Sequence, residues 1–353
     1  MVERKPSLAR VGEYTGYRAF GWSIRSNRAL PDLVSTGPCE KSDEVDLDID
    51  FVGDVPVLKL DPPYRPLMTS GSAGGRALLR VHRLEDDSIR MKVDGVPGRP
   101  GQYFEFVIGT QGERIRIACP PDKPIKELLP FLYNAAFGIA MRLAGICCLH
   151  ANVLEWNGQG LILLGPKGAG KSTLSDAMIQ AGCRLVADDI AAIHWEAGMA
   201  KVQAGLAQLR LTERVARQQH GAGLKSARLW NHESADWNKR VVRVGADRFF
   251  DRAVPVATVL QLGARQEGIS LPVTRRLLGT SALVALARHP FAPYVLTPGL
   301  RARNHADVSR LLDQVQILDI SLPDDLSKLN EAATFLLAQD LTSPHTTAGG
   351  PGN

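Results

Sequence analysis

Residues 165–173 carry the densest group of residues that could do chemistry. They read Gly-Pro-Lys-Gly-Ala-Gly-Lys-Ser-Thr and match the pattern G-x-x-x-x-G-K-[ST]. Glycines permit a tight turn that a Cβ would obstruct, and consecutive N–H groups before a helix form a nest for an anion. Lys171 would reach the terminal phosphates, and the Ser172 hydroxyl would ligate Mg²⁺. The motif predicts a nucleoside triphosphate site formed by Gly165, Pro166, Lys167, Gly168, Ala169, Gly170, Lys171, Ser172 and Thr173.

Two adjacent carboxylates follow this motif. Asp188 comes seventeen residues after Lys171, and Asp189 is next to it. Both follow a short apolar strand, 184–187. A strand, helix and strand of this length form a right-handed crossover, which brings the carboxyl ends of the two strands to one edge of a sheet. One carboxylate could then hold the metal ion while the other accepts the proton of an attacking hydroxyl. The alternative is an Asp-Asp pair in an ordinary polar loop.

The strands that would position these groups can be recognised from their patterns. Residues 147–156 alternate like a strand, and Asn157-Gly158 is a strong hairpin turn. The chain then returns as the apolar run 161–164, which ends at the glycine-rich motif. A helical pattern begins at residues 171–173. The sequence therefore predicts a hairpin, a loop and a helix around the phosphate site.

Residues 124–146 have apolar side chains at the three-and-four spacing of a packed helix. The stretch 128–149 is also long enough to be considered as a membrane span. It contains Pro130, Asn134 and Arg142, however, and a charge in the middle of a span is costly. We therefore expect a buried helix and no membrane span.

The remaining segments complete the expected architecture. Residues 1–122 read as a β-rich N-terminal region with candidate strands at 14–24, 44–52, 77–81, 89–93, 103–108 and 114–119. Within it, Glu44, Asp46, Asp48 and Asp50 alternate; a metal site is one interpretation and an exposed strand face the preferred one. A second domain is expected over 123–340, with further strands at 239–244, 254–262, 269–274 and 314–320 and helices at 212–219, 281–289, 301–311 and within 326–338. The tail 341–353 is expected to be disordered. The predicted class is α/β, or α+β overall, with a mixed sheet flanked by helices.

Composition excludes several classes of protein. The chain has 353 residues, 44% of them hydrophobic, and a net charge of +5, which does not by itself indicate a nucleic acid partner. Its five cysteines are odd in number and contain no C-x-x-C pair, so a disulfide framework or a zinc site is not expected. The first residues lack the apolar core of a secretory signal, and we expect a cytoplasmic location. Positive charge is concentrated in 201–252, and we interpret 221–238 as a lid or loop.

The segment 149–189 resembles the catalytic domain of the HPr kinase/phosphorylase family. The resemblance rests on Leu149-His150-Ala151, on the glycine-rich motif and on residues 182–189, Gly-Cys-Arg-Leu-Val-Ala-Asp-Asp. The chain looks most similar to the shorter relatives of that family, the serine kinases found near lasso-peptide biosynthesis genes. Weaker similarity extends through Lys239-Arg240 and residues 255–260.

The resemblance implies a P-loop kinase domain that uses ATP and Mg²⁺. It implies Lys171 on the β- and γ-phosphates, Asp188 as the base toward a serine hydroxyl, and Ser172 and Asp189 on the metal side. His150 would lie close to the carboxylates, although a lone histidine on a strand is more often structural. Lys239 and Arg240 become candidates for a substrate or lid contact.

One signature of the family is absent. The Glu-x-Arg-Gly motif of the HPr kinases is missing, and Leu-Arg-Leu-Thr-Glu at 209–213 occupies its place. Glu213 is then a second candidate metal ligand, and both the HPr substrate and the phosphorylase reaction lose support. Three functions stay open at this point: a kinase for a serine of a peptide or small protein, a small-molecule kinase, and a nucleotide-binding regulator without transfer. The oligomeric state also stays open, since larger members of the family assemble.

Overall fold

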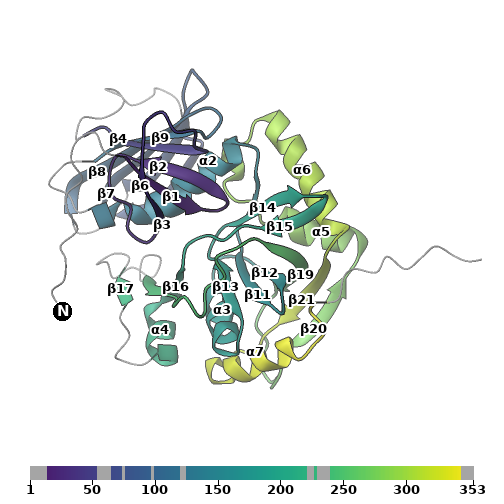
Figure 1. Ribbon diagram of the computed structural model, residues 1–353. Helices are drawn as coiled ribbons and strands as arrows, with labels where there is room; N and C mark the ends of the chain where they lie inside the picture. The colour runs from purple at the N-terminus through teal and green to yellow at the C-terminus, as the bar shows by residue number, and fades with distance from the viewer. Residues whose placement is uncertain are drawn as a thin grey trace, which may run out of the picture. The chain divides into compact units, whose positions relative to one another are not determined.

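The computed structural model describes residues 14–53, 65–73, 76–96, 99–119, 125–220, 226–228 and 239–342. They divide into two compact units, one ending at Ala144 and the other beginning at Gly145 (Figure 1). Each unit contains a large mixed sheet, and most of the described helices belong to the second. The presence of mixed sheets and helices confirms the predicted α+β class.

The first unit is built on a nine-stranded sheet with the order β3-β1-β2-β4-β9-β8-β7-β6-β5. Strands β5 to β9 form an antiparallel meander, whereas β4 pairs in parallel with both β2 and β9. Alternate residues such as Met91, Val93, Phe104 and Phe106 are buried, as period-two patterning requires. The bounds are β1 Tyr14–Ala19, β2 Trp22–Ser26, β3 Val34–Cys39, β4 Leu47–Phe51, β5 Met68–Ala73, β6 Arg76–Arg83, β7 Ile89–Val96, β8 Arg99–Ile108 and β9 Arg114–Ala118.

Two details of this sheet differ from the expectations. The predicted strand 14–24 is a hairpin, because Phe20 and Gly21 both have positive φ and turn the chain between β1 and β2. The alternating acidic residues do not share an exposed face, since Asp48 is buried. Its carboxylate pairs with the buried Arg25 at 3.0 Å and with Arg114 at 3.5 Å. One residue of the acidic run, Asp48, therefore takes part in ion pairs within the first unit.

The predicted helix 124–146 is helical but interrupted. It contains a 3₁₀ turn at Ile125–Glu127, α1 at Leu129–Phe131, a π-helical turn at Leu132–Ala136 and α2 at Phe137–Leu143. Phe137 packs edge-on against Phe20, and the Tyr133 hydroxyl donates to the Pro31 carbonyl. These contacts explain why the segment belongs to the first unit, so that the division falls after Ala144 and not near residue 122. Among the described residues, no helix combines the length and the apolar character that crossing a membrane requires.

The second unit has three layers. Its main sheet has the order β10-β14-β15-β19-β12-β11-β13, and β21 joins β19 and β20. The helices α3 and α7 contribute to one core, with Leu161 and Leu163 of the sheet. The helices α5 and α6 contribute to another, with Ile162 and Leu164 (Figure 1). Helices thus cover both faces of β12, the strand before the glycine-rich motif. This explains why its residues 161–164 are all apolar and do not alternate with polar ones.

The elements of this unit agree broadly with the predictions. Val254–Leu262 has the predicted bounds, whereas the strand expected at 269–274 lies at Val273–Leu277. The strands are β10 Cys147–Leu149, β11 Asn152–Trp156, β12 Gln159–Leu164, β13 Arg184–Ala187, β14 Ala191–Glu196, β15 Met199–Val202, β16 Gln208–Thr212, β17 Ser226–Arg228, β18 Lys239–Arg243, β19 Val254–Leu262, β20 Val273–Leu277 and β21 Gln316–Ser321. The helices are α3 Lys171–Gln180, α4 Glu213–His220, α5 Gly279–Ala287, α6 Pro298–Leu312 and α7 Leu329–Leu337, with 3₁₀ turns at Pro293–Val295 and Leu326–Lys328. Most of the expected lid 221–238, and the tail beyond residue 342, lie outside the described residues.

Strand direction sets the position of the site. β12 pairs antiparallel with β11, which pairs antiparallel with β13, so β12 and β13 run in the same direction. The carboxyl end of β12, the carboxyl end of β13 and the start of β11 consequently meet at one edge of the sheet. β12 also pairs in parallel with β19 on its other side. This edge is where an α/β sheet of this kind presents a ligand site.

Candidate functional site

The glycine-rich motif forms a loop between β12 and α3. Gly165, Gly168 and Gly170 all have positive φ, at 153°, 88° and 98°. At Gly165 a Cβ would also lie 3.1 Å from the Cβ atoms of Ala169 and Leu262. Helix α3 begins at Lys171, and its first backbone bond runs from the Leu174 N–H to the Gly170 carbonyl. The sequence pattern thus corresponds to a strand, loop and helix, the local geometry that anion binding at a helix N-terminus requires.

The side chains of the motif differ in exposure. Lys171 is buried, and its Nζ donates to the Gly165 carbonyl at 2.8 Å. Burial lowers the pKa of Lys171, and the positive charge of Lys239 adds to the effect. Pro166, Lys167 and Gly168 are exposed at the tip of the loop, whereas Ser172 and Thr173 are half-buried in α3. Lys171 therefore lies folded back along the loop, within the turn that the phosphates would occupy.

The two carboxylates lie beside the first turn of α3. The Ser172 hydroxyl donates to Asp188 Oδ1 at 3.4 Å, and the Arg210 N–H donates to Asp188 Oδ2 at 2.9 Å. Asp189 Oδ2 accepts from the Arg210 guanidinium at 3.2 Å, and both side chains of this ion pair are largely buried. Asp189 has a φ of 66°, a conformation that aspartate and asparagine tolerate better than most residues. The turn thus aims the two neighbouring carboxylates at different partners, Asp188 toward Ser172 and Asp189 toward Arg210.

The surroundings move the pKa values of the two carboxyls in opposite directions. Burial and the neighbouring charge of Asp189 raise the pKa of Asp188 to about 7. Burial would also raise the pKa of Asp189, but the positive charges of Arg210 and Lys239 outweigh it and hold this pKa below its ordinary value. A pair of carboxyls whose pKa values are pushed apart is typical of acid–base sites. Asp188 can accept a proton near neutral pH, whereas Asp189 stays ionised.

The Asn152 side chain links helix α3 by hydrogen bonds to the turn that carries Asp188 and Asp189. It is fully buried at the start of β11. Its Nδ2 donates to Ser175 Oγ at 3.0 Å and to Ser172 Oγ at 3.4 Å, while its Oδ1 accepts from the Asp189 N–H at 3.3 Å. One amide therefore fixes the distance between α3 and the turn after β13. The alternating pattern of 147–156 did not single out this residue, although an amide in an otherwise apolar buried strand is a usable signal.

Two histidines border the site. The backbone N–H of His150 donates to the backbone carbonyl of His289 at 2.8 Å. The centroids of the His150 and Phe291 rings lie 6.2 Å apart. Burial lowers the pKa of His150, partly offset by the negative charge of Asp189. Burial and the charge of Lys171 lower the pKa of His289 to about 4. His150 thus lies within electrostatic reach of Asp189 and Lys171, and both rings are neutral at pH 7.

The basic residues after the site divide into two groups. Lys239, at the start of β18, acts on the pKa values of Lys171, His150, Asp188 and Asp189 and so lies within reach of the whole site. Arg240, the next residue, instead donates to Glu213 Oε1 at 3.0 Å, and Arg217 donates to the same oxygen at 2.6 Å. The Glu213 carboxylate is therefore engaged by two arginines, which does not fit a second metal ligand.

The oxygen atoms around Ser172 fit a magnesium ion in one respect. A hydroxyl and a carboxylate lie together at the N-terminus of α3, and hard oxygen ligands are those that Mg²⁺ prefers. Within the described residues, no group of three or more His, Cys, Asp or Glu side chains could hold a metal on its own. Magnesium sites at nucleotides commonly use one or two carboxylates and complete the shell with phosphates and water. The residues present suit an ion that arrives with a nucleotide.

Comparison with known proteins adds a solved structure. No protein family model matches the chain, and no curated protein matches it. Among solved structures, the chain is similar to an HPr(Ser) kinase/phosphatase from Coxiella burnetii, with 14% identity and a TM-score of 0.27, over 54% of this chain and 93% of that chain. A similarity at this level carries no argument about function, which must be built on the site itself.

Proposed function

We propose that the protein is an ATP-dependent phosphotransferase that requires Mg²⁺ and phosphorylates a serine hydroxyl of a peptide or small protein. One observation carries the proposal. The glycine-rich loop with Lys171 and the carboxylates Asp188 and Asp189 meet at one edge of the sheet, with Ser172 contacting Asp188. A phosphate site beside a carboxylate with a pKa near 7 is the minimum that transfer to a hydroxyl requires.

The roles follow from the contacts. The loop N–H groups and Lys171 would hold the β- and γ-phosphates, and Ser172 with a carboxylate would hold Mg²⁺. Bound Mg²⁺ would neutralise charge on the phosphate oxygens. Asp188 would accept the proton of the acceptor hydroxyl while the hydroxyl oxygen attacks the γ-phosphorus. The bond between the γ-phosphorus and the oxygen that bridges it to the β-phosphate breaks, and ADP leaves. Asp189 stays ionised in its ion pair with Arg210 and would have to leave that pair to ligate Mg²⁺. His150 is neutral and half-buried, within electrostatic reach of Asp189 and Lys171.

The peptide acceptor is supported by the sequence resemblance and by the charge of the segment after the site. Lys239 is half-buried and close to the carboxylates, in a region with eleven Lys or Arg against five Asp or Glu over residues 201–252. An excess of positive charge in this segment of the sequence suits an extended or acidic acceptor better than a compact metabolite. We expect Lys239, rather than the ion-paired Arg240, to contact the acceptor or the γ-phosphate.

Incubation with γ-labelled ATP and Mg²⁺ tests this function. Label on a serine of a peptide or small protein is the expected result. Label on a metabolite would make the protein a small-molecule kinase, and tight nucleotide binding without transfer would make it a regulator. Absence of nucleotide binding would overturn the interpretation of residues 165–173. Asp188→Asn is the matched variant, since it keeps the shape of the side chain and should remove transfer while leaving nucleotide affinity within about twofold.

A further inference from the structure

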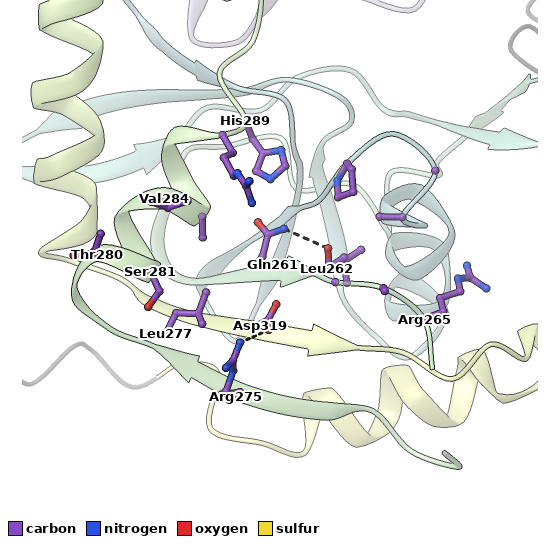
Figure 2. A pocket seen from close by; sticks show the side chains of 17 residues that line it. Gln261, Leu262, Arg265, Arg275, Leu277, Thr280, Ser281, Val284, His289 and Asp319 are labelled. Carbon is purple, nitrogen blue, oxygen red and sulfur yellow. Dashed lines mark hydrogen bonds and ion pairs between the residues drawn. The ribbon is translucent and has the colours of Figure 1, made fainter. Parts of the chain in front are cut away.

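An open space lies directly beside the glycine-rich loop. It is a cavity of about 1140 Å³ within the second unit, and Pro166, Gly168 and Ala169 of the loop form one of its walls. The other walls come from the end of β19, from β20 and β21, and from α5 (Figure 2). Sites for small molecules typically measure about 300–1,000 Å³, so the space is large enough for a nucleoside. Asp188, Asp189 and Ser172 do not line it.

The position of the cavity follows from the order of the strands. β12, β19 and β21 pair in parallel, and Gln261 of β19 lies opposite Asp319 of β21 near their carboxyl ends. The cavity opens at these ends, on the β19 side of β12. Asp188 and Asp189 follow β13, on the β11 side of β12. In an in-line transfer the attacking and leaving oxygens lie on opposite sides of the γ-phosphorus. If the acceptor lies at Asp188, the nucleoside belongs on the other side of the loop, where the cavity is.

The lining has the chemistry that a nucleoside needs. Leu262, Leu277, Val284 and Ala285 offer apolar surface against which a flat base could pack. Thr280 and Ser281 add hydroxyl groups from the first turn of α5 (Figure 2). Most small-molecule sites combine apolar walls with a few polar groups in this way.

Arg265 links the cavity to the phosphate site. It lines the cavity, and its Nη2 lies so close to Gly170 that a Cβ added there would be 2.9 Å away. Its guanidinium also lies 3.9 Å from the half-exposed carboxylate of Asp324. The Arg265 guanidinium lies between the cavity and the N-terminus of α3. A positive charge there would face the α- and β-phosphates of a nucleotide whose nucleoside occupies the cavity.

Gln261 provides an unused acceptor. Its Nε2 donates to the Leu262 carbonyl at 3.3 Å, which fixes the orientation of the amide (Figure 2). Its Oε1 is buried, and no hydrogen-bond donor reaches it within the described part of the chain. Leaving a buried acceptor without a donor is unfavourable. The exocyclic amino group of adenine could supply the missing donor.

We propose that this cavity binds the adenosine part of ATP, with the base packed against the apolar wall of α5 and its amino group directed to Gln261. The inference rests on the proposed function, because it takes the triphosphate to lie on residues 165–173. Val284 is the informative position, since it lines the cavity and is 42% exposed on α5, so a large side chain there need not disturb the core.

The experiment compares two ligands that share the phosphates but not the nucleoside. The affinities of Mg·ATP and of Mg·tripolyphosphate are measured by calorimetry for the full chain and for Val284→Trp. We expect Val284→Trp to weaken ATP about tenfold or more and to change tripolyphosphate by less than about twofold. Val273→Trp, the same change at a residue that is 51% exposed on β20 and does not line the cavity, should leave both affinities unchanged.

The outcomes separate the two proposals. If neither ligand binds the unaltered chain, the proposed function fails. If both bind and Val284→Trp weakens neither of them, or weakens both equally, the nucleoside lies elsewhere and only the cavity assignment fails.

Discussion

Asp188 and Asp189 are neighbours in the chain but have opposite electrostatic surroundings. Asp188, with a pKa of about 7, is protonated below that pH and cannot accept a proton there. We therefore expect kcat/KM for phosphoryl transfer to fall about tenfold for each pH unit below 7 and to level off above it. A pH–rate profile with saturating Mg²⁺ measures this limb. A flat profile from about pH 5 to pH 8 would exclude Asp188 as the base.

The histidines provide the control for that profile. The pKa values of His150 and His289 are both lowered, that of His289 to about 4, so neither ring accounts for a limb near 7. His150→Gln should keep the limb at the same pH, whereas Asp188→Asn should lower kcat about 10²–10⁴-fold and abolish the limb. A limb that disappears in His150→Gln would transfer the role of base to the histidine.

Asn152 makes its contribution through position. The side-chain amide of Asn152 forms hydrogen bonds with the Ser172 hydroxyl, the Ser175 hydroxyl and the Asp189 N–H. All three hydrogen bonds are lost in Asn152→Ala. We expect this variant to lose about 1–3 kcal/mol of unfolding free energy and about 10–100-fold in kcat, with a smaller change in the affinity for ATP. Urea unfolding and steady-state kinetics measure the two effects. An unchanged kcat in a destabilised protein would make Asn152 purely structural.

At the scale of the elements, the loop depends on backbone conformations that only glycine adopts readily. Gly170 has a φ of 98°, and a Cβ there would lie 2.9 Å from Arg265 Nη2. Gly170→Ala should cost about 1–2 kcal/mol of backbone strain and weaken nucleotide binding, because it also displaces Arg265. Gly158→Ala is the matched control, since Gly158 has a φ of 79° in the β11–β12 hairpin and open space around its Cβ. Equal nucleotide affinity in the two variants would contradict a specific role for the loop conformation.

The elements nearest the site were also the easiest to predict. The loop, the strand before it and the Asn157-Gly158 hairpin depend on local pattern, and Val254–Leu262 is a long β-branched run. The contacts inside the site were harder. Asn152 meets Asp189 across 37 residues and Arg210 meets it across 21, and nothing in the local sequence announces such pairings. Asp48 was misjudged for the same reason, because its partner Arg25 lies on another strand of the first unit.

At the scale of the whole molecule, the residues proposed to contact ATP all belong to the second unit. Mg·ATP should therefore slow amide hydrogen exchange in the second unit, most strongly in the loop and first turn of α3 and in the turn after β13, because binding lowers the population of locally open states. Peptides from the core strands β8 and β9 of the first unit provide the internal reference and should not change.

Mass spectrometry of exchange with and without Mg·ATP measures this pattern, and Lys171→Ala should abolish it. At a concentration of 100 times Kd, the added stability of the closed site is about 2.7 kcal/mol, so exchange through local opening should slow by about 100-fold. Protection of β19 and α5 as well would agree with adenosine in the cavity that Gln261 lines. Protection limited to residues 165–176 would locate the phosphates of ATP but not its adenosine part. Exchange that is unchanged throughout the second unit would contradict nucleotide binding at this loop.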